Sequence, residues 1–157
     1  MPVHISQDDL SDGTIEALLN EHLQEMYKYS PPESIHALDS SKLRDPAITF
    51  WAARVNGELA GCGAIKELDQ HCAEIKSMKT APAFTRQGVA TKLLEVMIEK
   101  AKQRSYKKLL LETGSDEAFV PAIRLYVQHG FKECKCFGDY KPDPFSKFYN
   151  LNLAENI

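Results

Sequence analysis

Glu74-Ile75-Lys76-Ser77-Met78-Lys79-Thr80-Ala81-Pro82-Ala83-Phe84-Thr85-Arg86-Gln87-Gly88-Val89-Ala90 is the most informative part of the chain. It predicts a strand, a turn marked by proline, a loop bearing glycine and the first turn of an amphipathic helix. Such a junction directs several backbone N–H groups and the positive end of a helix dipole at one point. The pattern therefore predicts a seat for a phosphate or pyrophosphate group.

The composition of the chain is that of an ordinary globular protein. It has 157 residues, 43% of them hydrophobic and 26% charged, and we expect residues 1–157 to form a single domain. No apolar run approaches the roughly 20 residues that span a bilayer. The N-terminal residues 1–9 lack the basic start and apolar stretch of a signal peptide. We therefore expect a cytoplasmic protein with no membrane partner.

The charge and the cysteine spacing argue against two further classes of protein, those that bind nucleic acid and those that bind zinc. The formal net charge is -3 and the pI about 6.0, which disfavours a nucleic-acid partner because such proteins favour basic surfaces. The four cysteines have neither C-x-x-C spacing nor the paired spacing of a zinc ribbon. We expect free thiols and no metal site, and the cysteines concerned are Cys62, Cys72, Cys134 and Cys136.

Before the opening stretch, periodicity predicts a short strand at residues 3–5 and a helix capped by Ser11 or Asp12 that runs to about Tyr27. The apolar stripe of this helix includes His22, which we interpret as a core residue. Prolines at 31 and 32 end it, and a short second helix at 33–38 is expected. Three antiparallel strands follow at 48–55, 58–67 and 72–80, the first two joined by an Asn56-Gly57 turn.

After the opening stretch, the pattern alternates between helix and strand. Helices are expected at about 89–104 and 119–129, and strands at 108–113, 131–136 and 147–153. The element order is therefore β-α-α-β-β-β-α-β-α-β-β. We expect an α/β fold whose mixed sheet has helices on both faces.

Two motifs resemble those of the GNAT-type N-acetyltransferases, which use acetyl-CoA. That family shows V-x-P followed by [RQ]-x-x-G-x-[GA], and this chain has Thr80-Ala81-Pro82 and Thr85-Arg86-Gln87-Gly88-Val89-Ala90. Further on the family shows N-x-x-A-x-x-L-Y-x-x-x-G-F. The corresponding residues here are Phe119-Val120-Pro121-Ala122-Ile123-Arg124-Leu125-Tyr126-Val127-Gln128-His129-Gly130-Phe131. The order of elements is similar across essentially the whole chain. Thr85 and Phe119 depart from the family pattern.

The resemblance implies a mostly antiparallel central sheet of about six or seven strands, with acetyl-CoA as cosubstrate. It places the pantetheine arm against backbone groups of Met78 and Thr80. Arg86 is the candidate to supply the charge that Thr85 lacks, and Phe119 replaces a cofactor-contacting Asn. The CoA pyrophosphate would meet the backbone N–H groups of Gln87, Gly88, Val89, Ala90 and Thr91.

The resemblance also implies catalytic roles. Tyr126 corresponds to the general acid that protonates the leaving thiolate, and a phenol is protonated at neutral pH. Glu74 is the candidate general base, as in those GNAT enzymes that use a carboxylate on this strand. Two alternatives stay open: Tyr126 as a packing residue on an amphipathic helix, and Glu74 as a solvent-facing charge.

The acceptor is less clearly encoded. By resemblance, Tyr27, Glu33, His36 and Tyr140 are candidates to line its site. The leading hypothesis is N-acetylation of a small-molecule amine. The alternatives are acetylation of a protein lysine or N-terminus, and a CoA-binding sensor without turnover. A homodimer is possible, since terminal strands of this fold often pair between subunits.

Overall fold

Seven strands form one mixed sheet in the order β1-β2-β3-β4-β5-β7-β6. The computed structural model describes residues 2–35 and 43–153. Every neighbouring pair is antiparallel except β4 and β5, which are parallel. The expected mixed, mostly antiparallel sheet is confirmed. Its strands are β1 His4–Asp8, β2 Ile48–Val55, β3 Glu58–Glu67, β4 Cys72–Thr80, β5 Lys108–Gly114, β6 Lys132–Cys134 and β7 Ser146–Asn152.

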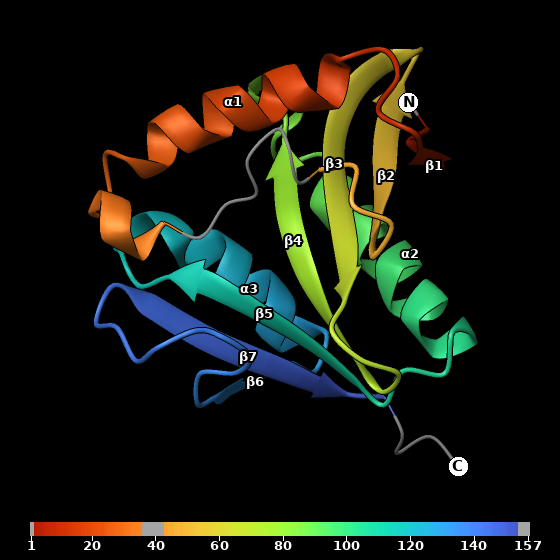
Figure 1. Cartoon of the computed structure of the whole chain (residues 1–157). Coiled ribbons are helices and arrows are strands. Elements are labelled where there is room, and N and C mark those ends of the chain that lie inside the picture. Colours follow the sequence, from red (N-terminus) through yellow and green to blue (C-terminus); the bar gives the residue numbers. More distant parts are fainter. Residues whose placement is uncertain (1, 36–42, 154–157) are drawn as a thin grey trace.

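Helices cover both faces of the sheet (Figure 1). One face carries α1 (Thr14–Met26), and the other carries α2 (Val89–Gln103) and α3 (Val120–Gln128). Alternation along β2 divides the core between the two faces. Phe50 packs with Ile15 and Leu18 of α1, whereas Trp51 packs with Leu93 and Met97 of α2.

A β-bulge interrupts β4 in its middle. The register pairs Ala64 with Lys76 but Cys62 with Lys79, so Ser77 and Met78 together oppose Gly63. Ser77 takes a positive φ of 57°, as a bulge can require. A Cβ on Gly63 would lie 2.6 Å from Met78 Sδ. The bulge thus turns Met78 towards the α2 face of the sheet, with which it packs.

Strands β4 and β5 separate beyond the bulge. They pair only from Cys72 to Ile75 and from Lys108 to Leu111. Beyond this point β4 continues beside β3, and β5 continues beside β7, so the two strands diverge like the arms of a V (Figure 1). The divergence opens the sheet where the backbone of β4 would otherwise be paired on both sides.

Five local expectations need correction. The opening strand expected at 3–5 extends from His4 to Asp8. The helix expected at 33–38 is a 3-10 turn at Pro32–Ser34, and Ile35 is extended with φ -96° and ψ 116°; residues 36–38 lie outside the described ones. The first helix begins after Gly13, whose φ is 76°, because the Asp12 carboxylate accepts the N–H of Thr14 in the turn before the helix.

The other two corrections are near the C-terminus. The helix expected from 119 begins at Val120, after the 3-10 turn Glu117–Phe119 capped by Asp116. Strand β6 begins one residue later than expected, because the N–H of Phe131 bonds to the carbonyl of Tyr126, and it ends two residues earlier, at Cys134. No helix in the described part of the chain is long and apolar enough to cross a membrane.

Candidate active site

A cleft of about 310 Å³ occupies the space between the diverging strands. Helix α1 forms one wall and α3 another, and β4 and β5 form the floor. The cleft thus gathers residues that are far apart in the sequence. Its polar or ionisable lining includes Glu16, Asn20, His22, Glu74, Lys76, Ser77, Glu112, Thr113, Tyr126 and Tyr140.

Glu74 is a buried carboxylate held by two donors. Tyr140 donates its hydroxyl hydrogen to Glu74 Oε2 across 2.5 Å, and Lys76 Nζ lies 3.4 Å from the same oxygen. Lys76 Nζ also donates to the Tyr140 hydroxyl across 2.9 Å. The side chains of Glu74 and Lys76 are only 5% and 11% exposed, so water screens this pair weakly. The solvent-facing alternative for Glu74 is therefore wrong.

Tyr140 reaches Glu74 from the loop between β6 and β7. Its ring packs against Phe137 and Phe148, and the Ser34 hydroxyl donates to Asp143 of the same loop across 2.5 Å. Burial, followed by the negative charge of Glu74, raises the pKa of Tyr140. The phenol therefore remains a proton donor to Glu74 throughout the neutral range.

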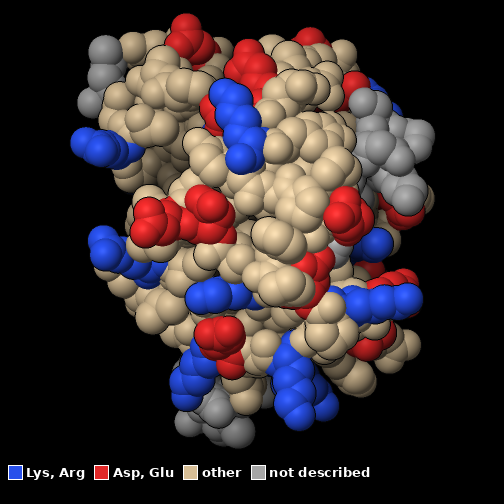
Figure 2. Space-filling model, turned by 90° about the vertical axis from the view of Figure 1, so that its left-hand side faces the viewer, with Lys and Arg blue, Asp and Glu red and all other residues tan. Residues whose placement is uncertain are grey.

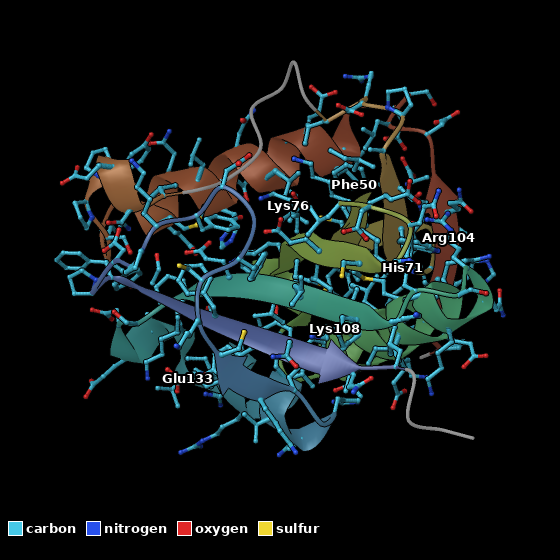
Figure 3. All side chains as sticks on the ribbon, turned by 60° about the horizontal axis from the view of Figure 1, so that its bottom comes forward. Phe50, His71, Lys76, Arg104, Lys108 and Glu133 are labelled. Carbon is cyan, nitrogen blue, oxygen red and sulfur yellow. The ribbon has the colours of Figure 1, made fainter. Side chains whose placement is uncertain are left out.

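Lys76 points into the space between α1 and the sheet, whereas His71 and Lys108 lie at the other end of the β4–β5 pair (Figure 3). Sequence reasoning did not single out Lys76 as a site residue. Its partner Tyr140 lies 64 residues away, and no local pattern brings the two together.

Tyr126 lies on the α3 side of the cleft. Its ring packs against Phe131 with centroids 5.7 Å apart, and burial raises the pKa of its hydroxyl to about 12. No described residue makes a hydrogen bond with that hydroxyl. Tyr126 both packs in the core and lines the cleft, so the packing interpretation and the active-site interpretation are compatible.

The N-terminus of α2 forms a cradle of backbone donors. Gly88 is its N-cap, with φ 81° and no side-chain cap, and a Cβ there would meet no atom within 4 Å. The N–H of Lys92 is the first to bond within the helix, to the Gly88 carbonyl. Those of Val89, Ala90 and Thr91 have no helical partner. Ahead of them, Arg86 also has a positive φ, 64°, and its side chain is exposed.

The free edge of β4 offers a second set of backbone groups. The N–H of Ala81 bonds to the Ala60 carbonyl of β3. Since backbone groups alternate in direction along a strand, those of Thr80 and Met78 point away from β3, towards the cleft. Strand β5 pairs with β4 only as far as Ile75, so it does not cover this edge.

Of the remaining residues that the sequence assigned to the site or its loop, some line the cleft and others do not. Thr85 is exposed, and its hydroxyl donates to the Pro82 carbonyl. Phe119 lines the cleft and stacks edge-on against Tyr29. Glu33 lines a neighbouring cavity of about 560 Å³ that shares Glu74, Lys76 and Tyr140 with the cleft. Tyr27 is 49% exposed and does not line the cleft. His36 lies outside the described residues.

Charges of both signs are interspersed on the face shown in Figure 2. A field of one sign would be expected on a surface that steers a highly charged polymer. All four cysteines are free thiols. In residues 2–35 and 43–153, no three His, Cys, Asp or Glu side chains are grouped to hold a metal ion.

Comparison with known proteins identifies the family. The model of the acetyltransferase (GNAT) family matches residues 15–131. The uncharacterized N-acetyltransferase YsnE of Bacillus subtilis (strain 168) is 52% identical, over 96% of this chain and 100% of the relative. The uncharacterized N-acetyltransferase YedL of Escherichia coli (strain K12) is 45% identical, over 97% of this chain and 96% of the relative. These matches cover the strands and helices that surround the cleft.

Solved structures share the fold. A candidate acyl-CoA N-acyltransferase from Klebsiella pneumoniae has a TM-score of 0.77 and 28% identity, over 96% of this chain and 97% of that chain. A GNAT acetyltransferase from Elizabethkingia anophelis, solved with acetyl-CoA bound, has a TM-score of 0.68 and 20% identity, over 96% and 97% of the two chains. The chain belongs to the GNAT acetyltransferase family and is an acyltransferase of the N-acetyltransferase type.

Proposed function

We propose that this enzyme transfers the acetyl group of acetyl-CoA directly to the primary amine of a small molecule. The observation that carries the proposal is that Glu74, Tyr126 and the part of β4 that β5 leaves unpaired all line one cleft. One group can remove a proton from an amine, and the other can supply a proton to a thiolate.

The residues at the α2 N-terminus fit the pyrophosphate of acetyl-CoA. The open space where a Gly88 Cβ would lie lets phosphate oxygens approach the backbone closely. The N–H groups of residues 87–91 and the helix dipole favour an anion there. Arg86 adds a positive charge at the same loop, and Phe119 gives the arm of the cofactor an apolar contact. The pantetheine amides would complete the edge of β4 by bonding to Met78 and Thr80, as an added strand does.

Acetyl-CoA, when bound, supplies the acetyl group and a thiolate leaving group. The acceptor must present a neutral amine to attack, and Glu74 accepts the amine proton, directly or through water. Tyr140 and Lys76 occupy Oε2 of Glu74, and no described residue engages Oε1. Oε1 is therefore the oxygen that receives the proton.

Tyr126 and Met78 act on the other side of the reacting centre. The Tyr126 hydroxyl is protonated at neutral pH because its pKa is about 12, so it can donate to the departing sulfur. The N–H of Met78 is the backbone donor for the carbonyl oxygen as negative charge grows on it. The bulge at Ser77 sets the direction of that N–H.

The size of the cleft favours a small acceptor. A volume of about 310 Å³ is at the small end of ligand sites, which hold about 300–1,000 Å³. The neighbouring cavity beyond Tyr140 is the observation that keeps a peptide amine as a second candidate. It is lined by carboxylates, among them Glu33, and by the lysines Lys66 and Lys141, so its space rather than the sign of its charge is what would accommodate a peptide.

Thiol release from acetyl-CoA, followed over a panel of small amines, peptides with lysine or a free N-terminus, and no acceptor, tests the proposal. We expect acetylated product from small amines at rates well above the background without acceptor. Glu74→Gln should then remove the acidic limb of the kcat/KM–pH profile. Turnover on peptides alone would favour the second candidate, and acetyl-CoA binding without turnover on any acceptor would favour a sensor.

A further inference from the structure

One polar atom in the wall of the cleft has no partner. His22 Nδ1 is the only buried side-chain nitrogen or oxygen without a hydrogen bond among residues 2–35 and 43–153. The residue belongs to the apolar stripe of α1, between Leu19 and Leu23, and it lines the cleft. Buried polar groups almost always find partners, so an orphan atom in a ligand cleft indicates a group that the ligand satisfies.

The charges around His22 indicate which ligand group fits. Burial, followed by the positive charge of Lys79, lowers the pKa of His22 to about 4, while Glu25 opposes this shift. Lys79 Nζ is 3.2 Å from Glu25 Oε2, and the Glu25 side chain is 51% exposed. Solvent therefore weakens the opposing effect of the Glu25 charge on His22. Lys79, whose side chain is 20% exposed, is the less screened of the two charges beside His22, and its positive charge favours an anion there.

The other charges of the cleft are further along its wall and floor. Glu16 of α1 pairs with Arg44, Glu74 of β4 pairs with Lys76, and Glu112 of β5 accepts a hydrogen bond from the Ser146 hydroxyl. The Glu74 end of the cleft thus suits the amine of the acceptor, while the His22 end suits a group of opposite charge. A neutral imidazole with its hydrogen on Nδ1 would donate that hydrogen to an anionic oxygen.

We propose that the acetyl acceptor carries a carboxylate in addition to its amine, and that His22 Nδ1 donates a hydrogen bond to this carboxylate. The inference rests on the proposed function and narrows its substrate class to amino acids and similar amino carboxylates. His22 is then a residue that determines specificity and takes no part in the chemical step.

Acceptors in matched trios test the carboxylate. Each trio consists of an L-amino acid, its primary amide and the amine that lacks the carboxyl group, for example L-phenylalanine, L-phenylalaninamide and phenethylamine. We expect the best acceptor of the panel to be a carboxylate whose kcat/KM exceeds that of both partners by about tenfold or more, the range for a polar pocket that loses its ligand group. Equal or better rates with the amide and the amine would overturn the proposal.

Two variants assign the effect to His22. His22→Leu should raise the KM of the carboxylate acceptor by about tenfold, leave its kcat and the KM of acetyl-CoA within about twofold, and leave the decarboxylated amine unaffected. His22→Asn, whose amide hydrogen can take the place of Nδ1–H, should restore part of the loss. Equal effects of His22→Leu on all three members of a trio would contradict the assignment.

NMR titration of the His22 imidazole separates this inference from the proposed function. Saturation with the preferred carboxylate should raise the pKa of His22 by about one unit or more, because a negative charge then lies beside the ring. The amide and the amine should leave it unchanged. A carboxylate that raises this pKa without being acetylated would contradict the proposed function alone. Carboxylates that leave the ring unaffected at saturation would overturn the role of His22.

Discussion

The two halves of β4 differ in almost every physical respect. From Cys72 to Ile75 the strand is paired on both sides, and its neighbours are the buried apolar side chains of Leu109 and Leu111. From Lys76 to Thr80 it is paired on one side, interrupted by a bulge and bordered by the cleft. We call these the closed half and the open half. The comparison teaches that ending a β-ladder early leaves backbone groups unpaired, and these are the groups that we propose bind acetyl-CoA. The closed half holds the two strands together.

The largest expected effect distinguishes Tyr126 of α3, which lines the cleft, from Tyr106, which precedes β5. Tyr126→Phe should lower kcat by about 10²-fold or more, because it removes the proposed proton donor while keeping the ring. Tyr106 near the closed half is the control, since its hydroxyl bonds to Glu67 Oε1 across 2.6 Å. Tyr106→Phe should cost about 1 kcal/mol of stability and leave kcat unchanged. Similar kcat values for both variants would mean that Tyr126 only packs.

Next in size is the effect of the Tyr140 hydroxyl on the open half. Tyr140→Phe removes the 2.5 Å hydrogen bond to Glu74, and the carboxylate loses a donor that stabilises its charge. We expect kcat/KM to fall by about tenfold, because the carboxylate that we propose as the base is then held in place less firmly. Tyr149→Phe, in β7, is the control. A kcat/KM that fell no further in Tyr140→Phe than in Tyr149→Phe would show that Tyr140 does not position the base.

A smaller effect is expected from a comparison of two glycines that have the same backbone conformation. Gly88 and Gly57 both have φ 81° and open space where a Cβ would lie, so alanine at either position should cost about 1 kcal/mol of stability. Only Gly88→Ala places a methyl group where the pyrophosphate would sit, and it should raise the KM of acetyl-CoA by about three- to tenfold. If Gly57→Ala raised that KM equally, the cradle would not be a binding site.

The last expected effect is on stability and leaves turnover unchanged. His22 has its pKa lowered to about 4 in the folded protein, so its contribution to stability is complete above about pH 6.5 and is lost as pH falls towards 4. Between pH 7 and 5 the loss should be about 1–2 kcal/mol. His22→Leu should flatten the dependence of the melting temperature on pH over this range. His71→Asn, in an exposed turn, should leave that dependence unchanged. If the dependence of the melting temperature on pH were the same in His22→Leu as in the original protein, the lowered pKa of His22 would be refuted.

Much of the fold was predictable because local signals agreed with tertiary structure. The hairpins are bounded by turns with strong backbone preferences, and Asn56 and Gly57 both take the expected positive φ. The helix after Gly88 has its apolar stripe on one face, and that face is buried in the core. The helix expected at 33–38 failed because proline can begin a 3-10 turn as readily as an α-helix.

The site was only partly predictable. The open half of β4 appears in the sequence as a continuous strand, because a bulge at Ser77 follows from the register with β3 and from the space beside Gly63. The contact of Tyr140 with Glu74 depends on β7 lying between β5 and β6. His22 fits an apolar stripe, so only its unpaired atom indicates a ligand. The cytoplasmic location and the homodimer stay predictions.

Residue-resolved hydrogen exchange, with and without saturating acetyl-CoA, compares the two halves of β4 most directly. The amides of Met78 and Thr80 should exchange at least about tenfold more slowly when acetyl-CoA is bound, because the ligand completes the open edge of the strand. Those of Ala73 and Ile75 should remain as they were, since their ladder is already complete. Unchanged exchange at Met78 and Thr80 in the saturated enzyme would contradict the proposal that this edge binds the cofactor.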